Sequence, residues 1–312
     1  MYLRRDDLKR TTRAPAKLNL YLEVLGRRSD GFHELETLMV PITLADWLAL
    51  TPTAPPANGN LGEIRLDVGP YYPVRPPPAV EEIPTGGSNL VVQALELLRE
   101  RSGCRFGARV ELVKRIPAAA GLGGASSDAA AALRLANRAW QLGWSQNRLA
   151  ELAAEIGSDV PFFLSGRPAL CRGRGERVEP IRGISRMHFV IVKPPVALKT
   201  ADVFQAHDKF ADTADQVESK RVNQLSAAIT TGRWPARCDW MHNRLQAAAA
   251  ALSPWVERLQ TTFNRLGCVG HQLTGSGSAY FGVCRHAQHA RRLTSLLRTR
   301  QLGLVYATHS YS

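Results

Sequence analysis

The chain has 312 residues, of which 45% are hydrophobic and 21% are charged. This is ordinary globular composition, which excludes a largely disordered chain and a collagen-like repeat, and the length predicts about two domains. Lysine and arginine number 40 against 27 aspartate and glutamate, so the net charge is +13. A charge of that sign favours anionic partners such as nucleic acid, acidic membranes or phosphorylated substrates.

Two absences in the sequence narrow the class of protein further. No run of apolar residues is long enough for a transmembrane helix, and the basic N-terminal segment has no apolar core of a secretory signal. The five cysteines are scattered and form no CxxC pair, so we expect reduced thiols rather than a disulfide framework or a zinc site. The sequence therefore predicts a cytoplasmic protein with no membrane partner.

The first predicted element is a strand over residues 16–24, where small and apolar residues alternate with Lys17, Asn19, Tyr21 and Glu23. A period of two predicts a strand with one buried face and one polar face. Residues 51–88 are rich in proline, which predicts an irregular region with one short strand over residues 63–68. We assign no function to residues 52–87.

From Asn89 the pattern becomes that of a helix, which Gly103 ends. A strand over residues 108–117 and a glycine-rich turn lead into an alanine-rich helix over about residues 127–142. The remaining predicted elements are helices over 145–156, 201–225, 244–266 and 287–297, strands over 188–194 and 304–308, and a strand–loop–strand unit over 271–284. Strands and helices interleave throughout, which predicts a mixed α and β class.

The strongest functional signal is the segment PAAAGLGGASSD, residues 117–128, between a predicted strand and the alanine-rich helix. Its three glycines allow positive φ and close approach of the backbone to a ligand. Several N–H groups then point into one concavity at the positive end of a helix, which is a site for phosphate. Ser126 and Ser127 lie at its mouth, where one hydroxyl can cap the helix and one can reach a metal-bound phosphate.

Two common phosphate-binding motifs do not fit this segment. A Walker A loop needs lysine and then serine or threonine after its last glycine, whereas Ala125 and Ser126 follow Gly124. A Rossmann fingerprint needs a third glycine and a second strand with an acidic residue, whereas the helical pattern here continues to about Ile156. A tight strand-to-helix turn with a capping serine and no ligand is the structural alternative.

Three further signals are weak when each is taken alone. Lys17 and Asn19 lie on the polar face of the first strand, where a solvent-facing lysine is commonplace. Asp159, in GSDVPFF, follows the end of a helix and is equally a turn residue that stabilises its own backbone. The segment TGSGS, residues 274–278, is equally a hairpin turn.

In chain order, the segments AKLNL, PAAAGLGGASSDAA, GSDVPFF and LTGSGSAYF together resemble the GHMP kinase superfamily. The resemblance extends from about Arg13 to the last strand. Its first block, APAKLNLYLEVLGRRSDGFHELETLMVPI, is similar to the branch of kinases that act on a cytidine-diphosphate-linked methylerythritol. The GxxxDGFHEL portion discriminates this branch, through Gly26, Asp30, Gly31, Phe32 and His33.

The resemblance implies an α+β fold of two domains. Residues 1–165 would form an N-terminal mixed α/β nucleotide-binding domain, and residues 166–299 a smaller C-terminal α/β domain of ferredoxin-like type; the last strand, about residues 300–312, can return to the first domain. It also implies ATP with Mg²⁺ as the phosphoryl donor, the C2 hydroxyl of the alcohol as acceptor, and the 2-phosphate and ADP as products. The pathway implied is the non-mevalonate route to isoprenoid precursors, and the protein would be a monomer or a homodimer.

The resemblance also implies catalytic and nucleotide-binding residues. Asp159 matches the general base, and Lys17 the basic partner that keeps this carboxylate ionised and offsets charge on the transferring phosphoryl group. Ser126 or Ser127 is the hydroxyl near the metal. The residues implied to bind the nucleotide are Asn89 and Leu90 at the adenine and, at the phosphates, Pro117, Ala118, Ala119, Ala120, Gly121, Leu122, Gly123, Gly124, Ala125, Ser126 and Ser127.

For the acceptor, the resemblance implies that Phe32 stacks on the cytosine and His33 forms a hydrogen bond with it. The segment KPPVALKTADVF resembles the second wall of the cytosine site, which implies Thr200 and Phe204 there. The other substrate-binding residues implied are Asn19, Gly275, Ser276 and Gly277. The sequence departs from the family at HNRLQ, where Arg244 replaces a residue that is usually acidic. We therefore assign no role to that position.

Two other functions fit parts of the sequence. Another kinase of the superfamily, acting on a sugar, homoserine or mevalonate, would share the phosphate loop, but Phe32 and His33 favour an acceptor that carries a base. A basic nucleic-acid-binding α/β module would fit the charge, but it leaves Asp159 and two phosphate-type loops without a role. Aromatic residues are only 7% of the chain and show no RNP-like array, so we expect a small-molecule substrate and no nucleic-acid partner.

Overall fold

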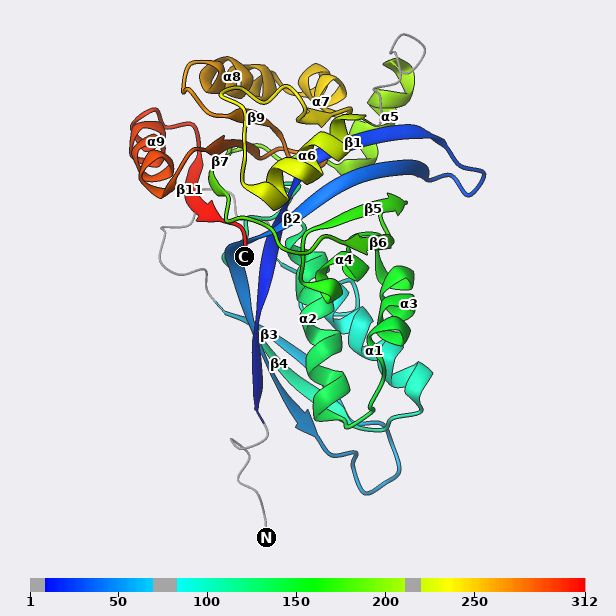
Figure 1. The fold of residues 1–312 in the computed structure, drawn as a ribbon. Coiled ribbons are helices and arrows are strands. Elements are labelled where there is room, and N and C mark those ends of the chain that lie inside the picture. Colours follow the sequence, from blue (N-terminus) through cyan, green and yellow to red (C-terminus); the bar gives the residue numbers. More distant parts are fainter. Residues whose placement is uncertain (1–8, 70–82, 211–219, 312) are drawn as a thin grey trace. The chain divides into compact units, whose positions relative to one another are not determined.

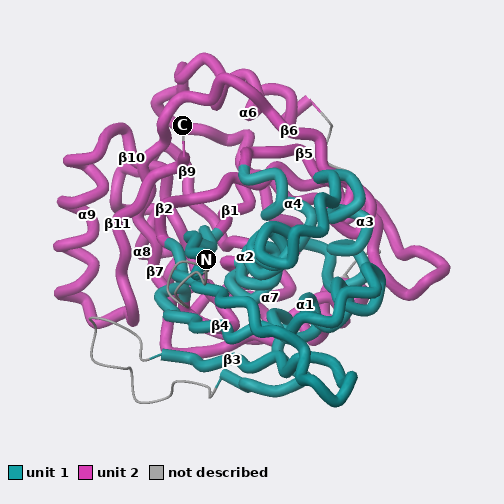
Figure 2. The backbone as a smooth tube through the Cα atoms, turned by 90° about the horizontal axis from the view of Figure 1, so that it is seen from below, with its two compact units in different colours: residues 1–16, 45–116, 123–166 teal, residues 17–44, 117–122, 167–312 magenta. Residues whose placement is uncertain are grey.

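The structure is a computed structural model that describes residues 9–69, 83–210 and 220–311. The chain divides into two units, which comprise residues 1–16, 45–116 and 123–166 and residues 17–44, 117–122 and 167–312 (Figure 2). The predicted domain boundary near residue 165 stays a prediction. Residues 70–82 and 211–219 lie outside the described residues, so the proline-rich region and the predicted helix over 201–225 are described only in part.

The sheet of the first unit contains β3 (Ile64–Gly69), β4 (Gly107–Val113) and the ends of two long strands, β2 (His33–Thr53) and β1 (Arg10–Arg27) (Figure 1). The order is β3-β4-β2-β1. β4 runs antiparallel to β2, with Val110 opposite Leu50, and parallel to β3, with Val110 opposite Leu66. The strand predicted over residues 63–68 is thereby confirmed as β3.

Four helices of the first unit pack against one another: α1 (Leu90–Ser102), α2 (Gly124–Ala139), α3 (Gln146–Ile156) and α4 (Val160–Ser165). The side chain of Asn89 accepts a hydrogen bond from the amide of Val91 and starts α1, while Gly103, in the left-handed region, ends it. Ser145 caps α3 in the same way. These two helices are confirmed as predicted, whereas α4 was not predicted.

The alanine-rich helix α2 begins at Gly124, three residues before the predicted start. Gly123 is its N-cap residue, with a φ of 71°, and no side chain caps the helix. Ser126 and Ser127 therefore lie inside the first turn rather than before it. Further along the helix, the run Ala129–Ala132 is fully buried, and its small side chains let the helix lie close to its neighbours.

The second unit contains a four-stranded antiparallel sheet of order β11-β7-β10-β9. The strands are β7 (His188–Lys193), β9 (Gly270–Leu273), β10 (Tyr280–Cys284) and β11 (Leu304–His309), and the helices are α5 (Thr200–Phe210), α6 (Lys220–Thr231), α7 (Gln246–Leu252), α8 (Pro254–Asn264) and α9 (Ala287–Thr299). In chain order, helices connect β7 to β9 and β10 to β11. This is the ferredoxin-like topology that we expected.

Val190, Val192, Leu259, Phe263 and Leu293 belong to the hydrophobic core of this unit. The predicted helix over residues 244–266 is broken into α7 and α8 in the structure. Ser253 is extended (φ −152°, ψ 120°) and Pro254 is the first residue of α8. Proline has no N–H to continue a helix and disfavours helical backbone in the preceding residue, so the apolar period continues across the break while the backbone does not.

Three short strands of the second unit were not predicted: β5 (Ala169–Gly173), β6 (Arg177–Pro180) and β8 (His242–Asn243). β5 pairs antiparallel with β2, with Cys171 opposite Thr37, and also with β6. β8 pairs parallel with β1, with His242 opposite Tyr21. Within the described residues, no helix is both long and apolar enough to cross a membrane.

Candidate functional site

The two glycine-rich segments that the sequence singled out contact each other within the second unit. The amide of Ala279 donates to the carbonyl of Ala120 (3.1 Å), and Oγ1 of Thr274 donates to the carbonyl of Gly121 (3.3 Å). A Cβ at Gly121, whose φ is +72°, would lie 2.1 Å from the carbonyl oxygen of Thr274. Only glycine fits there, so the close approach of the two loops explains this residue.

Lys17 and Asn19, on β1, lie against these loops. Nζ of Lys17 donates to Oδ1 of Asn19 (2.5 Å), and the amide of Asn19 donates to Oγ1 of Thr274 (3.2 Å). A Cβ at Gly275 would lie 3.2 Å from Nζ of Lys17. The structure thus brings together Lys17, Asn19, Gly121 and Gly275, four residues of the predicted site.

The predicted polar face of β1 is not exposed to solvent. Lys17, Asn19, Tyr21 and Glu23 are 4%, 2%, 1% and 2% exposed, as deeply buried as the apolar residues between them. The expectation of one solvent-facing side is therefore wrong, because β1 is covered on both faces. Buried polar side chains need hydrogen-bond partners, and both have one here, Lys17 with Asn19 and Asn19 with Thr37.

Two residues that were not predicted to belong to the site hold the TGSGS loop and β1 in place. Nδ2 of Asn243, in β8, donates to the carbonyl oxygens of Leu273 and Gly275, both at 2.9 Å. Nε2 of Gln272 donates to the carbonyl of Asn19 (2.8 Å). The sequence drew attention to the segment HNRLQ for its arginine alone, yet the preceding asparagine fixes the TGSGS loop.

Ser126 and Ser127 differ in what they can reach. Ser127 is 0% exposed, its amide donates to the carbonyl of Gly123, and its hydroxyl has no partner within the described part of the chain. Ser126 is partly exposed. The prediction that a serine caps this helix is wrong. The amides of the first turn of a helix have no partner within the helix, and with the helix dipole they favour an anion.

A buried ion cluster of the first unit joins the two ends of the glycine-rich segment. Nζ of Lys114, after β4, donates to Asp46 and to Oδ2 of Asp128 (2.7 Å), while Oδ1 of Asp46 also accepts the amide of Ile116 (2.8 Å). Burial raises the pKa of Asp128. Burial alone would lower the pKa of Lys114, but the two carboxylates outweigh it and raise that pKa. The cluster ties β2, the end of β4 and the first turn of α2 together.

The predicted base-binding residues His33 and Phe204 meet in the second unit. Their rings stack, with centroids 4.7 Å apart and planes at 24°. Nε2 of His33 lies 2.6 Å from Oδ1 of Asp208, a residue of α5 that sequence reasoning missed. Phe32 is half exposed, and the guanidinium of Arg174 lies over its ring, 4.6 Å from the centroid. Oγ1 of Thr200 lies 2.9 Å from Oγ of Ser276.

The residues predicted to act as the general base and to bind the adenine lie in the first unit. Asp159 precedes α4 with helical backbone (φ −85°, ψ −11°), and its side chain makes no capping hydrogen bond to that helix. Its convergence with Lys17 stays a prediction. Asn89 uses both ends of its amide locally, since Oδ1 accepts from Val91 and Nδ2 donates to the carbonyl of Pro84 (2.7 Å). Adenine binding at Asn89 and Leu90 stays a prediction.

Arg244, the departure from the family pattern, has a structural partner. Its Nε lies 2.5 Å from Oε1 of Glu23, and Nε2 of His242 lies 3.1 Å from Oε2. Glu23 is almost completely buried. Burial alone would raise the pKa of Glu23, but His242 and Arg244 outweigh it and lower that pKa. Arg244 therefore neutralises a buried carboxylate of β1.

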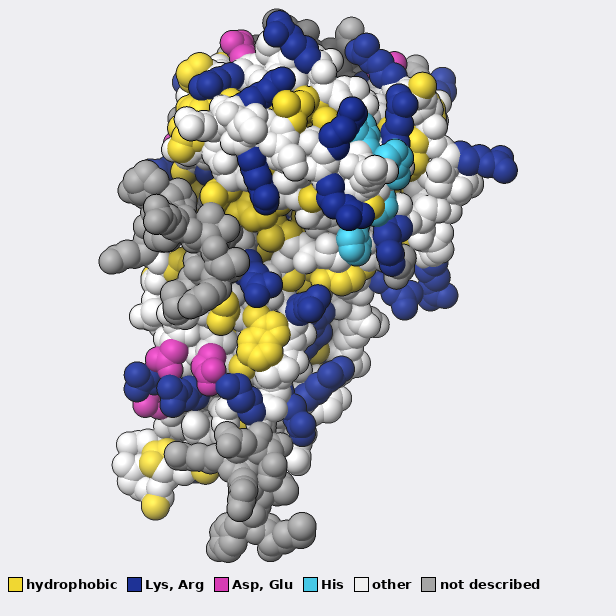
Figure 3. Space-filling model, turned by 90° about the vertical axis from the view of Figure 1, so that its left-hand side faces the viewer, with side chains coloured by type: hydrophobic (Ala, Val, Ile, Leu, Met, Phe, Trp, Pro, Cys, Tyr) yellow, Lys and Arg dark blue, Asp and Glu magenta, His cyan; other side chains and the backbone are white. Residues whose placement is uncertain are grey.

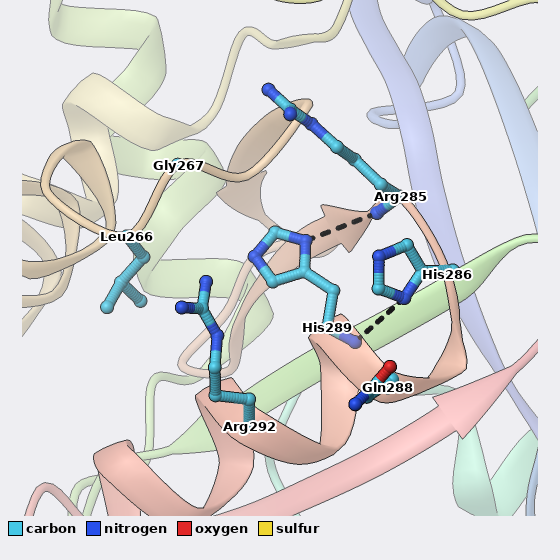
Figure 4. A pocket seen from close by; sticks show the side chains of 7 residues that line it. All are labelled: Leu266, Gly267, Arg285, His286, Gln288, His289 and Arg292. Carbon is cyan, nitrogen blue, oxygen red and sulfur yellow. Dashed lines mark hydrogen bonds between the residues drawn. The ribbon is translucent and has the colours of Figure 1, made fainter.

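A hollow of the second unit is lined by basic residues and contains none of the predicted site residues. Its lining consists of Leu266, Gly267, Arg285, His286, Gln288, His289 and Arg292 (Figure 4). Nδ1 of His289 accepts the amide of Arg285 at 3.3 Å. Burial and the neighbouring arginines lower the pKa of His289. Figure 3 shows histidines gathered among lysines and arginines on one face of the molecule.

Comparison with known proteins agrees with the resemblance seen in the sequence. Residues 89–167 match the profile of the GHMP kinases N terminal domain, and residues 225–299 that of the GHMP kinases C terminal domain. The 4-diphosphocytidyl-2-C-methyl-D-erythritol kinase of Bacillus cytotoxicus is 37% identical over 93% of this chain and 93% of its own. The enzyme of the same name from Shouchella clausii is 37% identical over 93% of this chain and 91% of its own.

Solved structures show the same relationship. A crystal structure of 4-(cytidine 5'-diphospho)-2C-methyl-D-erythritol kinase has a TM-score of 0.76 at 34% identity and covers 97% of this chain and 100% of its own. Homoserine kinase from Cytophaga hutchinsonii has a TM-score of 0.72 at 16% identity, over 100% of this chain and 97% of its own, and so shares the fold. With 37% identity over more than nine-tenths of both chains, this protein belongs to the 4-diphosphocytidyl-2-C-methyl-D-erythritol kinase family of the GHMP kinases.

Proposed function

We propose that the protein transfers the γ-phosphoryl group of ATP to the C2 hydroxyl of 4-diphosphocytidyl-2-C-methyl-D-erythritol, giving the 2-phosphate and ADP. This reaction belongs to the non-mevalonate route to isoprenoid precursors. The observation that carries the proposal is the buried ammonium of Lys17, held by Asn19 beside Gly275 in one of two contacting glycine-rich loops. Family membership over almost the full chain supports the choice of acceptor.

Phosphoryl transfer asks a protein mainly for positioning and charge stabilisation. The amides around Gly121 and the first turn of α2 supply donors for the phosphates of ATP. Lys17 would offset charge on the transferring group, and Asn19 would hold the ammonium and contact the acceptor. Asp159 would accept the proton of the C2 hydroxyl, since a carboxylate can take a proton that the attacking oxygen must lose.

The residues present fit a Mg²⁺ ion that arrives with the nucleotide. Among the described residues, no three His, Cys, Asp or Glu side chains form a metal-binding group. Mg²⁺ is usually bound through one or two carboxylates together with substrate phosphates, so a dedicated protein cage is not required. Of the two serines, Ser126 fits the hydroxyl near the metal better because Ser127 is fully buried. When bound, the ion would offset negative charge on the phosphates.

The base of the acceptor would lie among Phe32, His33 and Phe204. Phe32 is half exposed and so has ring surface available for stacking. Thr200 would line the cytosine site beside Phe204, and Gly275, Ser276 and Gly277 would contact the rest of the acceptor. The proposal also includes a cytoplasmic location, action as a monomer or homodimer, and domains that divide near residue 165.

The proposal is tested by measuring ADP release from ATP and Mg²⁺ with four separate acceptors. These are 4-diphosphocytidyl-2-C-methyl-D-erythritol, mevalonate, homoserine and galactose. We expect turnover of the cytidine-linked alcohol, with the new phosphate on C2 by ³¹P NMR. Turnover of mevalonate, homoserine or galactose instead would contradict the proposed substrate while leaving the kinase assignment in place. No ADP release with any acceptor would contradict both.

A further inference from the structure

His33, the first residue of β2, is held on several sides by α5. Its side chain is only 11% exposed. Phe204 stacks on the imidazole at 4.7 Å, and the ring of His207 lies edge-on to it at 6.4 Å. These contacts restrict rotation of the ring, so each of its two nitrogens keeps one direction.

One of these nitrogens faces a carboxylate. Nε2 of His33 lies 2.6 Å from Oδ1 of Asp208, although the two residues are 175 positions apart in the chain. A carboxylate has no hydrogen to donate, so Nε2 must carry the proton of this bond. In a neutral imidazole that carries its proton on Nε2, Nδ1 has a lone pair and can only accept a hydrogen bond.

An accepting Nδ1 distinguishes the two pyrimidine bases that share a ring shape. Cytosine carries an amino group that donates at ring position 4, whereas uracil, like thymine, carries an oxygen that accepts there. We propose that Asp208 is a positioning residue that fixes the tautomer of His33 and thereby makes the base subsite select cytosine over uracil. The inference rests on the proposed function and adds the residue that sets its base specificity.

The main test is Asp208→Asn, which keeps the shape of the side chain but introduces a donor. The amide nitrogen can donate to Nε2, which lets the proton of His33 move to Nδ1 and removes the preference for an amino group. We expect the ratio of kcat/KM for the cytidine-linked over the uridine-linked alcohol to fall at least about tenfold. This is the size of the discrimination that one good polar contact with a base edge provides. The loss should lie in KM for the cytidine-linked alcohol, with kcat and the KM for ATP nearly unchanged.

Two matched variants separate positioning from a structural role. Asp208→Glu keeps an acceptor-only group and should restore part of the base preference. Asp202→Asn is the same chemical change on the same helix, at an exposed position, and should leave the preference unchanged. Equal ratios in wild-type protein and Asp208→Asn, with both proteins folded, would overturn the inference.

A second measurement needs no substrate. In protein with ¹⁵N-labelled histidine, the His33 signals, assigned by their loss in His33→Gln, should show a protonated Nε2 and an unprotonated Nδ1. Asp208→Asn should change this pattern. An imidazolium in the wild-type protein near neutral pH, or an unchanged pattern in the variant, would contradict the role of Asp208. Absence of phosphorylation by wild-type protein would contradict the proposed function instead, and the NMR result would still decide the tautomer.

Discussion

Nζ of Lys17 donates a 2.5 Å hydrogen bond to Oδ1 of Asn19, two residues further along the same strand. Side chains two apart in a strand share a face, so the short spacing brings the ammonium and the amide together. Nδ2 of Asn19 in turn donates to Oγ1 of Thr37 (2.8 Å), which anchors the pair to β2. The ammonium is therefore fixed in place beside the glycine-rich loops.

Lys17→Met should lower kcat by about 100-fold or more, the effect of losing one donor that stabilises transition-state charge. Methionine fills much of the same buried volume without the charge, so the fold should persist. Steady-state kinetics with ATP and the cytidine-linked alcohol measures kcat, and circular dichroism checks that the variant is folded. Lys9→Met is the matched control, because Lys9 forms a partly exposed pair with Glu111 (2.9 Å) and should leave kcat unchanged. A kcat for Lys17→Met close to that of wild type would remove Lys17 from the mechanism.

Asp159→Asn should lower kcat by about 10²–10⁴-fold, the usual contribution of a general base, which corresponds to about 3–5 kcal/mol of activation free energy. The amide keeps the shape but cannot take the proton. Asp67→Asn, in an exposed pair with Arg65 and Arg109, is the control and should retain full activity. If a folded Asp159→Asn variant lost less than about tenfold in kcat, Asp159 could not be the base.

Gly121→Ala should disturb the contact between the glycine-rich loops, and Gly143→Ala shows how much of the effect is backbone strain alone. Both glycines have positive φ, +72° and +66°, but a Cβ at Gly143 would meet nothing within 4 Å. Gly143→Ala should therefore cost only about 1–2 kcal/mol of stability. Gly121→Ala adds a clash with the carbonyl of Thr274, so it should lower the melting temperature further and raise the KM for ATP. Equal effects of the two substitutions would contradict the close approach.

Much of the fold could be predicted from the sequence where local signals decide it. Asn89 and Gly103 mark the ends of α1 because an amide cap and a left-handed residue act within one turn of the helix. The break at Pro254 was missed although proline is a local signal, because the apolar period continues through it. The early start of α2 was missed because Gly123 acts as the N-cap residue without a side chain, which leaves no sequence mark.

The candidate site likewise contains residues that could be predicted from the sequence and residues that could not. Glycines that allow close approach and a lysine two residues before an asparagine could be recognised in the sequence, and the structure brings them together. Asp208 and Asn243 could not, because they act through the tertiary fold on residues that are 175 positions away for Asp208 and 30 and 32 positions away for Asn243. The burial of Lys17 was also hidden, because alternation along β1 cannot reveal that a second layer covers its polar face.

Glu23→Gln should reveal a pH-dependent contribution to stability. Because His242 and Arg244 lower the pKa of Glu23 in the folded state, its ionised form stabilises the protein above the unfolded pKa, and this contribution is lost as the pH falls through the folded pKa. At neutral pH the variant leaves Arg244 without its buried carboxylate and should lose about 3 kcal/mol of unfolding free energy. The difference in unfolding free energy between the variant and wild type should narrow below about pH 4.5. Denaturant unfolding over this pH range measures it, and Glu151→Gln, at an exposed position of α3, should show no such trend. A difference that stayed constant with pH would mean that the charge of Glu23 contributes nothing to folding.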